Sequence, residues 1–303
     1  MGVCGNLVLT ISFTEPGCNL CQSQDIKVIV RAGKYSDGRP GDIVRCSHCG
    51  LIYRYLQYRK VSRKDHHSAI HSSYPADLTN QRKKLFKRYG EAVSLFRKYN
   101  RILDVGSGHG YFLGLCREQG WKVFGVELNP ELAQFAKSKF DIDVFKGSFE
   151  QARYSKNYFD VVTLWNVLEH LENPYVALRK AYENLRPGGA IFLKFTNANL
   201  HILLRKVFYW LSIFWRGIKR FDDSCIGMYA FNRFTITQYL VKMGFQEILI
   251  DNARPKGLCR DLLDSKLKAI IALTILPLAI VAEVVTGDRN LFVTSLLVRA
   301  IKP

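Results

Sequence analysis

The sequence predicts an α/β protein with a mostly parallel sheet, preceded by a small module organised by cysteines. From Arg101 onward, short apolar runs alternate with helical stretches of about ten residues, a pattern typical of βαβ units whose sheet is covered on both faces. The first of these runs ends in closely spaced glycines, and two Cys-x-x-Cys pairs precede the whole pattern. We therefore expect two domains, at residues 14–56 and 78–303.

The expected elements follow one another along the chain. A helix with mixed apolar and basic faces covers Leu78–Tyr99, and Pro130 opens the helix Pro130–Phe140. Asn173-Pro174-Tyr175 indicates the start of another helix, Pro174–Leu185. The other expected helices are Tyr111–Gln119 and Phe234–Met243, and the expected strands are Ile102–Val105, Lys122–Leu128, Asp143–Lys146, Phe159–Trp165, Ala190–Phe195, Gln246–Asp251 and Leu291–Arg299.

The cysteine module predicts a structural zinc site. Cys18 and Cys21 form one pair and Cys46 and Cys49 the other, and two such turns can supply four thiolates to a tetrahedral ion. Zinc would stabilise a segment too short to build a core of its own. The alternative is four unrelated buried thiols. The first residues lack a secretory signal pattern, so we expect a reducing, cytoplasmic environment.

The glycine-rich stretch Gly106-Ser107-Gly108-His109-Gly110 predicts a nucleotide-type site. Glycines let backbone N–H groups approach a ligand, and the next helix presents its positive end to that ligand. Glu127 ends the following strand about 20 residues later, where a carboxylate can accept hydrogen bonds from ribose hydroxyls. The spacing G-x-G-x-G differs from the dinucleotide pattern. The alternative for Glu127 is a solvated carboxylate at a strand end.

Four motifs in order make this chain similar to a known family. ILDVGSGHG, VFGVELNP, FDVVTLWNVLEHLENP and LRPGGAIFL resemble those of class I S-adenosylmethionine-dependent methyltransferases, in particular the ubiquinone-biosynthesis-type O-methyltransferase branch. The resemblance covers 101–195 tightly and 228–245 more loosely. It implies a Rossmann-like seven-stranded sheet with the last strand antiparallel. An N-terminal zinc ribbon occurs in a subset of that family.

The resemblance also implies positions for the cofactor, S-adenosylmethionine. It places Asp104 and the glycine turn around the methionine part, Glu127 on the ribose and Leu128 beside the adenine. Ser148 stands where the family often has Asp, and Trp165 would line the methyl-bearing side with Asn166. The cofactor-binding residues predicted in this way are Asp104, Gly106, Ser107, Gly108, Gly110, Glu127, Leu128, Ser148, Phe149 and Asn166.

Methyl transfer to oxygen usually needs a base, and His170 is the candidate. It is the histidine inside the matched motifs near the strand ends, and imidazole titrates in the useful pH range. The alternative, which we favour, is a structural residue that orders the loop before Pro174. We interpret Glu169 as a partner within its helical turn rather than as a second base.

Charge and two inserts bear on the acceptor. The chain carries 44 Lys and Arg against 26 Asp and Glu, a net charge of +18 that lies mainly in its first and last thirds. Insert 199–228 is basic and aromatic, typical of a lid, an interfacial surface or a packed helix. Insert 258–288 contains an apolar run, 269–282, that is too short to span a bilayer. We therefore allow peripheral membrane contact but expect no transmembrane segment.

The sequence favours methylation of a small or lipid-linked metabolite, with oxygen as the expected acceptor atom. The alternative is an RNA methyltransferase whose basic ribbon and flanks bind phosphates. The Asn-Pro-Pro-Tyr signature of base-modifying enzymes is missing after the strand Phe159–Trp165, so nucleic acid is not the partner we expect. The sequence sets neither the acceptor nor the oligomeric state.

Overall fold

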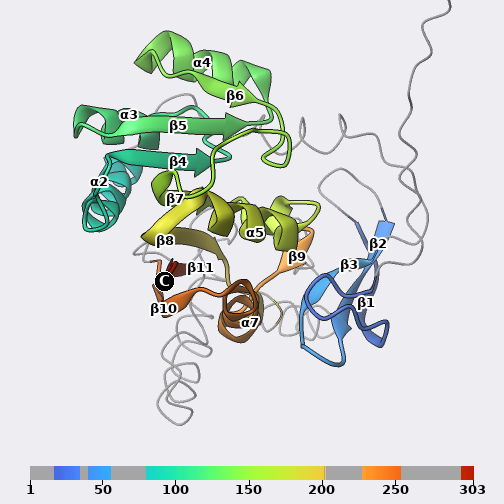
Figure 1. Ribbon diagram of the computed structural model, residues 1–303. Coiled ribbons are helices and arrows are strands. Elements are labelled where there is room, and N and C mark those ends of the chain that lie inside the picture. The colour runs from blue at the N-terminus through green and yellow to red at the C-terminus, as the bar shows by residue number, and fades with distance from the viewer. Residues whose placement is uncertain (1–16, 35–39, 56–79, 201, 203–226, 254–294) are drawn as a thin grey trace, which may run out of the picture.

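The computed structural model describes residues 17–34, 40–55, 80–200, 202, 227–253 and 295–303 (Figure 1). Its larger sheet has seven strands in the order β10-β11-β8-β7-β4-β5-β6, and β11 is antiparallel to both of its neighbours. This confirms the predicted Rossmann-like sheet with an antiparallel last strand. The strands are β4 (Arg101–Val105), β5 (Lys122–Glu127), β6 (Val144–Lys146), β7 (Phe159–Trp165), β8 (Leu185–Thr196), β10 (Gln246–Asn252) and β11 (Ser295–Ile301).

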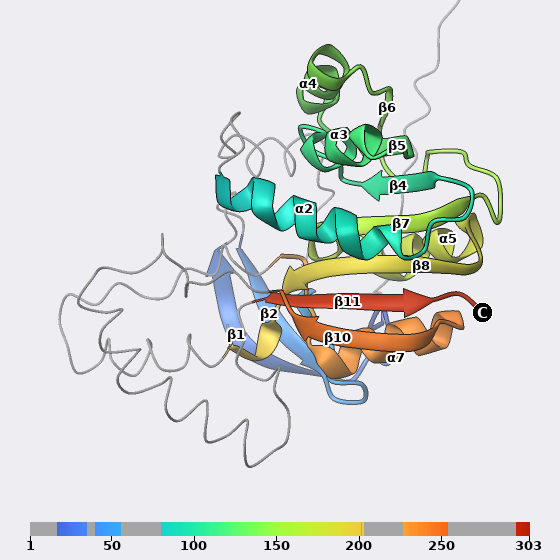
Figure 2. The ribbon, with the colours of Figure 1, turned by 90° about the vertical axis from the view of Figure 1, so that its left-hand side faces the viewer.

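Helices cover both faces of this sheet, as the alternating pattern predicts (Figure 2). Buried side chains of α2 and α3 pack on one face, and those of α5 and α7 pack on the other. Asparagine side chains start three helices: Asn129, Asn173 and Asn232 each accept backbone N–H bonds in the first turn. The helices are α2 (Asn80–Ser94), α3 (Tyr111–Glu118), α4 (Pro130–Phe140), the 3₁₀ turn η1 (Leu168–His170), α5 (Pro174–Asn184) and α7 (Arg233–Met243).

Strand β8 begins five residues earlier than predicted. Leu185 pairs with Phe159 of β7, and the register then shifts before Ala190 pairs with Val161. The Arg-Pro-Gly-Gly stretch between these pairs therefore lies within the strand as an irregularity. Gly188, at φ 70°, donates its N–H to the carbonyl of Lys302 at 2.7 Å. The hydrogen bond from Gly188 to Lys302, a residue more than 100 positions away, thus helps to extend β8 back to Leu185. The sequence alone predicts the end of a helix at this position.

The second sheet is formed mainly by the cysteine module. Its order is β1-β2-β3-β9, with β1 (Ile26–Lys34), β2 (Pro40–Cys46) and β3 (Ile52–Tyr55) joined by the short strand β9 (Tyr229–Ala230). All of its pairs are antiparallel, and β9 comes from the chain that follows the fifth parallel strand. The sheet lies toward the edge at which the parallel strands end (Figure 2). The module is therefore completed by a strand of the larger domain.

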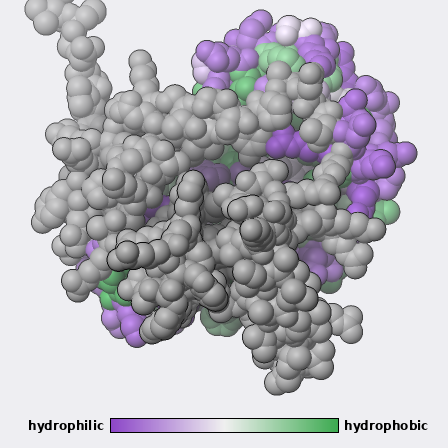
Figure 3. Space-filling model, turned by 180° about the vertical axis from the view of Figure 1, so that it is seen from behind, coloured by the Kyte–Doolittle hydropathy of each residue, from purple (hydrophilic) through white to green (hydrophobic). Residues whose placement is uncertain are grey.

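The described surface is mostly hydrophilic when seen from behind (Figure 3). Within the described part of the chain, no helix combines the length and the apolar character needed to cross a membrane. Nearly all of insert 199–228 and the whole of insert 258–288 lie outside the described residues. The expectations about a lid and a membrane contact there stay predictions.

Candidate cofactor and metal sites

The glycine turn after β4 has the conformation that the predicted ligand site needs. Gly106, Gly108 and Gly110 have φ values of 71°, 54° and 74°, in the left-handed region that favours glycine. A Cβ on Gly106 would lie 2.4 Å from the Val167 side chain. A Cβ on Gly108 would meet nothing within 4 Å. The turn therefore packs against its neighbours at Gly106 and leaves its backbone open at Gly108, as a cradle for a ligand would require.

Glu127 points at this turn. Its carboxylate is 2% exposed and accepts the Gly108 N–H at 2.8 Å and the Asn129 N–H at 2.9 Å, one on each oxygen. The parallel register of β4 and β5 brings the two strand ends together. A carboxylate can accept about four hydrogen bonds, so each oxygen keeps capacity for a ribose hydroxyl. The free acceptor capacity of the carboxylate thus fits the sugar hydroxyls of a nucleoside. Because Glu127 is buried, the alternative of a solvated carboxylate is wrong.

Asp104 is buried behind the turn. The carboxyl is 2% exposed and accepts a hydrogen bond of 2.6 Å from the Thr163 hydroxyl. Burial raises its pKa to about 7, although the bond from Thr163 opposes this rise. Thr163 was not among the predicted residues. Its register opposite Asp104 on the adjacent strand is the signal that places it there.

The residues predicted to flank the adenine lie after β5 and β6. The Gly147 N–H donates to the Glu127 carbonyl at 3.0 Å, and this bond draws the two strand ends together. Leu128 and Ser148 are half-buried beside this junction. Phe149 is buried in the core, with the Lys180 ammonium over its ring at 5.2 Å. Leu128 and Ser148 are therefore partly accessible at these strand ends, whereas Phe149 lies in the core.

The chain after β7 holds the remaining predicted residues. Asn166 takes a left-handed φ of 55° and donates its N–H to the Lys194 carbonyl at 2.7 Å. The half-buried His170 lies against the segment before β9, because a Cβ on Gly227 would come within 3.1 Å of its Nδ1. The structure thus brings Asn166 to the strand edge and sets His170 against backbone.

The four predicted cysteines converge. The sulfur atoms of Cys18, Cys21, Cys46 and Cys49 lie within 4.8 Å of one another, with Cys18–Cys49 at 3.4 Å and Cys21–Cys46 at 3.5 Å. Zinc–sulfur bonds of about 2.3 Å in a tetrahedron place sulfurs about 3.8 Å apart. Burial raises the pKa of Cys18 to about 11, so a bound cation is needed to keep that thiol ionised. The cluster fits a structural zinc ion and contradicts the alternative of unrelated thiols.

The zinc knuckle is bonded directly to the larger domain. Asn19 donates to the Asn173 side chain at 2.9 Å and accepts from the Tyr239 hydroxyl at 2.9 Å. The Lys242 ammonium donates to the Leu20 carbonyl at 2.7 Å. Leu20 also belongs to the same buried cluster as side chains of α7. The module and the larger domain therefore share one core.

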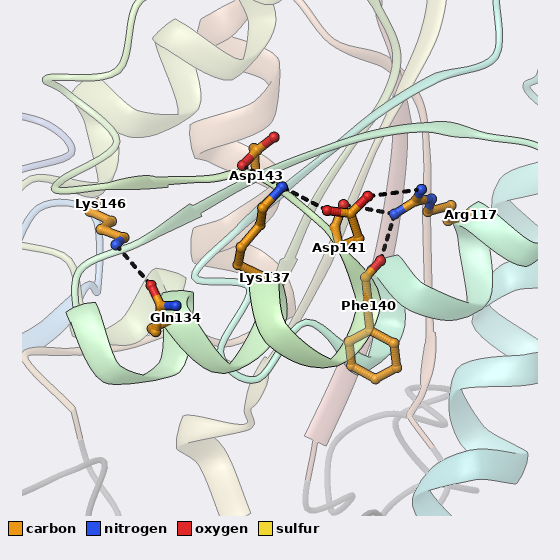
Figure 4. Close-up of polar contacts among 7 residues, drawn as sticks. All are labelled: Arg117, Gln134, Lys137, Phe140, Asp141, Asp143 and Lys146. Atoms are coloured by element: carbon orange, nitrogen blue, oxygen red, sulfur yellow. Dashed lines mark hydrogen bonds and ion pairs between the residues drawn. The ribbon is translucent and has the colours of Figure 1, made fainter.

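A further group of polar contacts joins the ends of α3 and α4 and links α4 to β6 (Figure 4). Arg117 donates to the carbonyls of Phe140 and Asp141 at the end of α4, and Lys137 bonds Asp141 at 2.7 Å and Asp143 at 3.1 Å. Arg117, Phe140 and Asp141 are among the residues that line a surface hollow between α3 and α4. Because α3 begins at the glycine turn and ends here, the hollow is remote from Glu127. Its exposed ion pairs cap a helix end.

Known proteins resemble the chain over the larger domain, which contains the glycine turn and Glu127. A sequence model described as "Methyltransferase domain" matches residues 78–249. A ubiquinone biosynthesis O-methyltransferase of Xanthomonas campestris is 34% identical over 103 residues, 32% of this chain and 43% of that protein. One of Escherichia coli O127:H6 is 33% identical over 115 residues, 36% of this chain and 47% of that protein. The chain thus matches less than half the length of these relatives.

A solved structure aligns with much of the chain. A SAM-dependent methyltransferase from Archaeoglobus fulgidus aligns with a TM-score of 0.48 at 20% identity, covering 73% of this chain and 94% of that one. The four motifs, the parallel strands β4 to β8 and the Gly108–Glu127 contact lie within the matched residues 78–249, which are more than half of the chain. This chain belongs to the methyltransferase-domain family.

Proposed function

We propose that this chain is an S-adenosylmethionine-dependent methyltransferase that acts on a small or lipid-linked acceptor, with a hydroxyl oxygen as the methylated atom. The Gly108–Glu127 contact carries the proposal, since it joins an open backbone turn to a carboxylate with free acceptor capacity. The likeness to O-methyltransferases of ubiquinone biosynthesis supports an oxygen acceptor.

Different residues of the site would bind different parts of S-adenosylmethionine. Glu127 would hold the ribose hydroxyls, Leu128 and Ser148 would border the adenine, and the glycine turn from Gly106 to Gly110 would lie around the amino-acid end beside Asp104. S-adenosylmethionine supplies an activated methyl group on a sulfonium. The protein therefore contributes alignment, a site shielded from water and removal of the acceptor's proton.

His170 stays a candidate for the base. Its place against Gly227 supports the structural role, which is to hold the chain before β9 over η1. A His170→Gln variant separates the two roles. If His170 is the base, the variant should methylate more slowly at every acceptor concentration and still bind S-adenosylhomocysteine. If His170 is a structural residue, the variant should lose both stability and S-adenosylhomocysteine binding.

Calorimetric titration with S-adenosylhomocysteine tests the proposal. Wild type should bind, and Glu127→Ala should weaken binding by roughly 30-fold or more, since two charge-assisted hydrogen bonds are lost. Glu127→Gln keeps one acceptor oxygen and controls for local unfolding, and Glu118→Ala controls for loss of an exposed carboxylate. Equal binding by wild type and Glu127→Ala would remove the assignment.

The acceptor class is tested with a radiolabelled methyl donor. Hydroxylated small molecules, their lipid-linked forms and transfer RNA are incubated with wild type and with Glu127→Ala. Label in a small or lipid-linked product, absent with the variant, supports the proposal. Label that enters only RNA would replace it with the alternative raised by the positive charge.

A further inference from the structure

A carboxylate completes the sheet where β7 stops. The β7–β8 ladder ends with the pair Trp165 and Lys194. Two residues on, the Thr196 N–H donates to Oε1 of Glu169 at 3.4 Å. The Glu169 side chain therefore accepts the hydrogen bond that a further residue of β7 would otherwise accept. This contact uses one carboxylate oxygen and accounts for the position of the side chain.

The second oxygen of Glu169 has no such role. The residue is 4% exposed, and among the described residues Oε2 has no hydrogen-bond partner. A buried polar oxygen without a partner is costly and calls for an explanation. Burial also raises the pKa of this carboxyl to about 7, while backbone N–H donors and the charge of Lys194 oppose the rise.

Lys194, two residues before Thr196 on β8, is a cation that interacts with this carboxyl. Lys194 ends the β7–β8 ladder on β8, on the sheet face that bears Phe192. Burial lowers the pKa of its ammonium, and Glu169 raises it, so the two charges interact. The nearby Arg82 of α2 lowers it again. Yet within the described part of the chain, no ion pair or hydrogen bond engages the Lys194 ammonium.

The buried Glu169 and the half-buried Lys194 thus carry opposite charges, and among the described residues neither Oε2 nor the ammonium is hydrogen-bonded. Both groups lie at the carboxyl ends of β7 and β8, the edge at which open α/β sheets bind their ligands. On the same strand end, Trp165 stacks on Tyr89 with centroids 4.3 Å apart. The stacked rings of Trp165 and Tyr89 are thus next to Lys194, the register partner of Trp165.

We propose that Glu169, rather than His170, deprotonates the acceptor, that Lys194 binds it, and that the acceptor presents an acidic hydroxyl to these two groups. This inference rests on the proposed function. In the step, the acceptor O–H bond breaks and its proton bonds to Oε2 of Glu169. The electron pair stays on the acceptor oxygen, which receives a hydrogen bond from the Lys194 ammonium. The proton passes to solvent after methylation.

The test uses 4-nitrophenol, whose phenolate absorbs visible light, added to the protein saturated with S-adenosylhomocysteine. Wild type should bind the probe and shift its ionisation to lower pH. Lys194→Met should weaken binding of the phenolate at least about tenfold. Glu169→Gln keeps a ladder oxygen and should abolish the shift, so that the bound probe ionises at the same pH as free 4-nitrophenol.

Controls separate this inference from the proposed function. Both variants should bind S-adenosylhomocysteine as wild type does, because neither residue belongs to the turn or to Glu127. Lys98→Met and Glu118→Gln change exposed charges and should leave probe binding intact. Equal probe affinity in Lys194→Met and Lys98→Met would overturn the inference. So would a wild-type complex that binds S-adenosylhomocysteine but no probe. Loss of nucleoside binding by wild type itself would instead refute the proposed function.

Discussion

The side-chain amide of Asn19, inside the zinc knuckle, donates a hydrogen bond of 2.9 Å to the side chain of Asn173, which starts α5. The Asn19 oxygen also accepts from the Tyr239 hydroxyl at 2.9 Å and the Tyr175 N–H at 3.2 Å. One residue thus joins the metal module to two helices of the larger domain. The chain that holds Glu169 and His170 runs directly into this junction.

Asn19→Ala should destabilise the whole protein by about 2 kcal/mol, because the Tyr239 hydroxyl and the Tyr175 N–H lose their acceptor and Asn173 keeps only its bond from Val176. Denaturant unfolding measures the loss. Zinc content should stay at one ion per chain, since no ligand changes. Gln134→Ala removes one exposed side-chain bond and serves as the control. A change below about 0.5 kcal/mol would show that the junction adds nothing to stability.

Metal removal should affect both domains together. Purified protein should contain one zinc, and Cys46→Ser should lose it, with one cooperative transition moved to lower temperature. We expect a single transition because Leu20 and Leu51 of the cysteine module share one core with side chains of α7. Cys116→Ala, a buried thiol outside the cluster, should keep the metal. Zinc retained at wild-type level in Cys46→Ser would contradict the assigned ligand set.

Gly108→Ala should impair ligand binding far more than folding. Its left-handed φ of 54° imposes about 1 kcal/mol of strain on alanine, while the new Cβ enters open space where the ligand would lie. Gly120→Ala is matched, with φ 85° and open surroundings at the other end of α3. Thermal unfolding should respond alike in the two variants. S-adenosylhomocysteine affinity should fall only in Gly108→Ala.

Asp104→Asn should become more stable relative to wild type as pH rises. The folded pKa of Asp104, about 7, lies above its ordinary value, so the folded wild type holds a proton that the unfolded chain releases. Wild type therefore loses stability between about pH 4 and pH 7, and the variant is spared this loss. The difference should reach about 1–3 kcal/mol by pH 8 in urea unfolding.

Asp160→Asn should show the opposite trend. Burial alone would raise the pKa of Asp160, but the Arg186 guanidinium at 2.5 Å and nearby amides hold it below its ordinary value. Its contribution is present at neutral pH and is lost as pH falls through the folded pKa. The variant should therefore be less stable than wild type at pH 7, with the gap closing in acid. Parallel pH trends for the two variants would contradict both assignments.

The candidate site was largely predictable where chemistry depends on local spacing. The Cys18–Cys21 and Cys46–Cys49 pairs, the glycine turn and Glu127 each follow from residue types a few positions apart or from one βαβ repeat. Thr163 and Lys194 were not predictable in this way. Each matters because strand register sets it beside Asp104 or close to Glu169, and register is absent from a single strand's pattern.

The sequence by itself determined the parallel α/β sheet, the cysteine cluster and the nucleotide-type turn, because hydrophobic periodicity and glycine backbone freedom act over short stretches. Tertiary structure alone decided that β9 completes the cysteine module, that Asn19 joins the module to α5 and α7, and that Glu169 bonds Thr196 at the end of β8. These relations connect residues separated by 27 to 220 positions. Only packing of the whole chain, through strand order and shared burial, can bring them together.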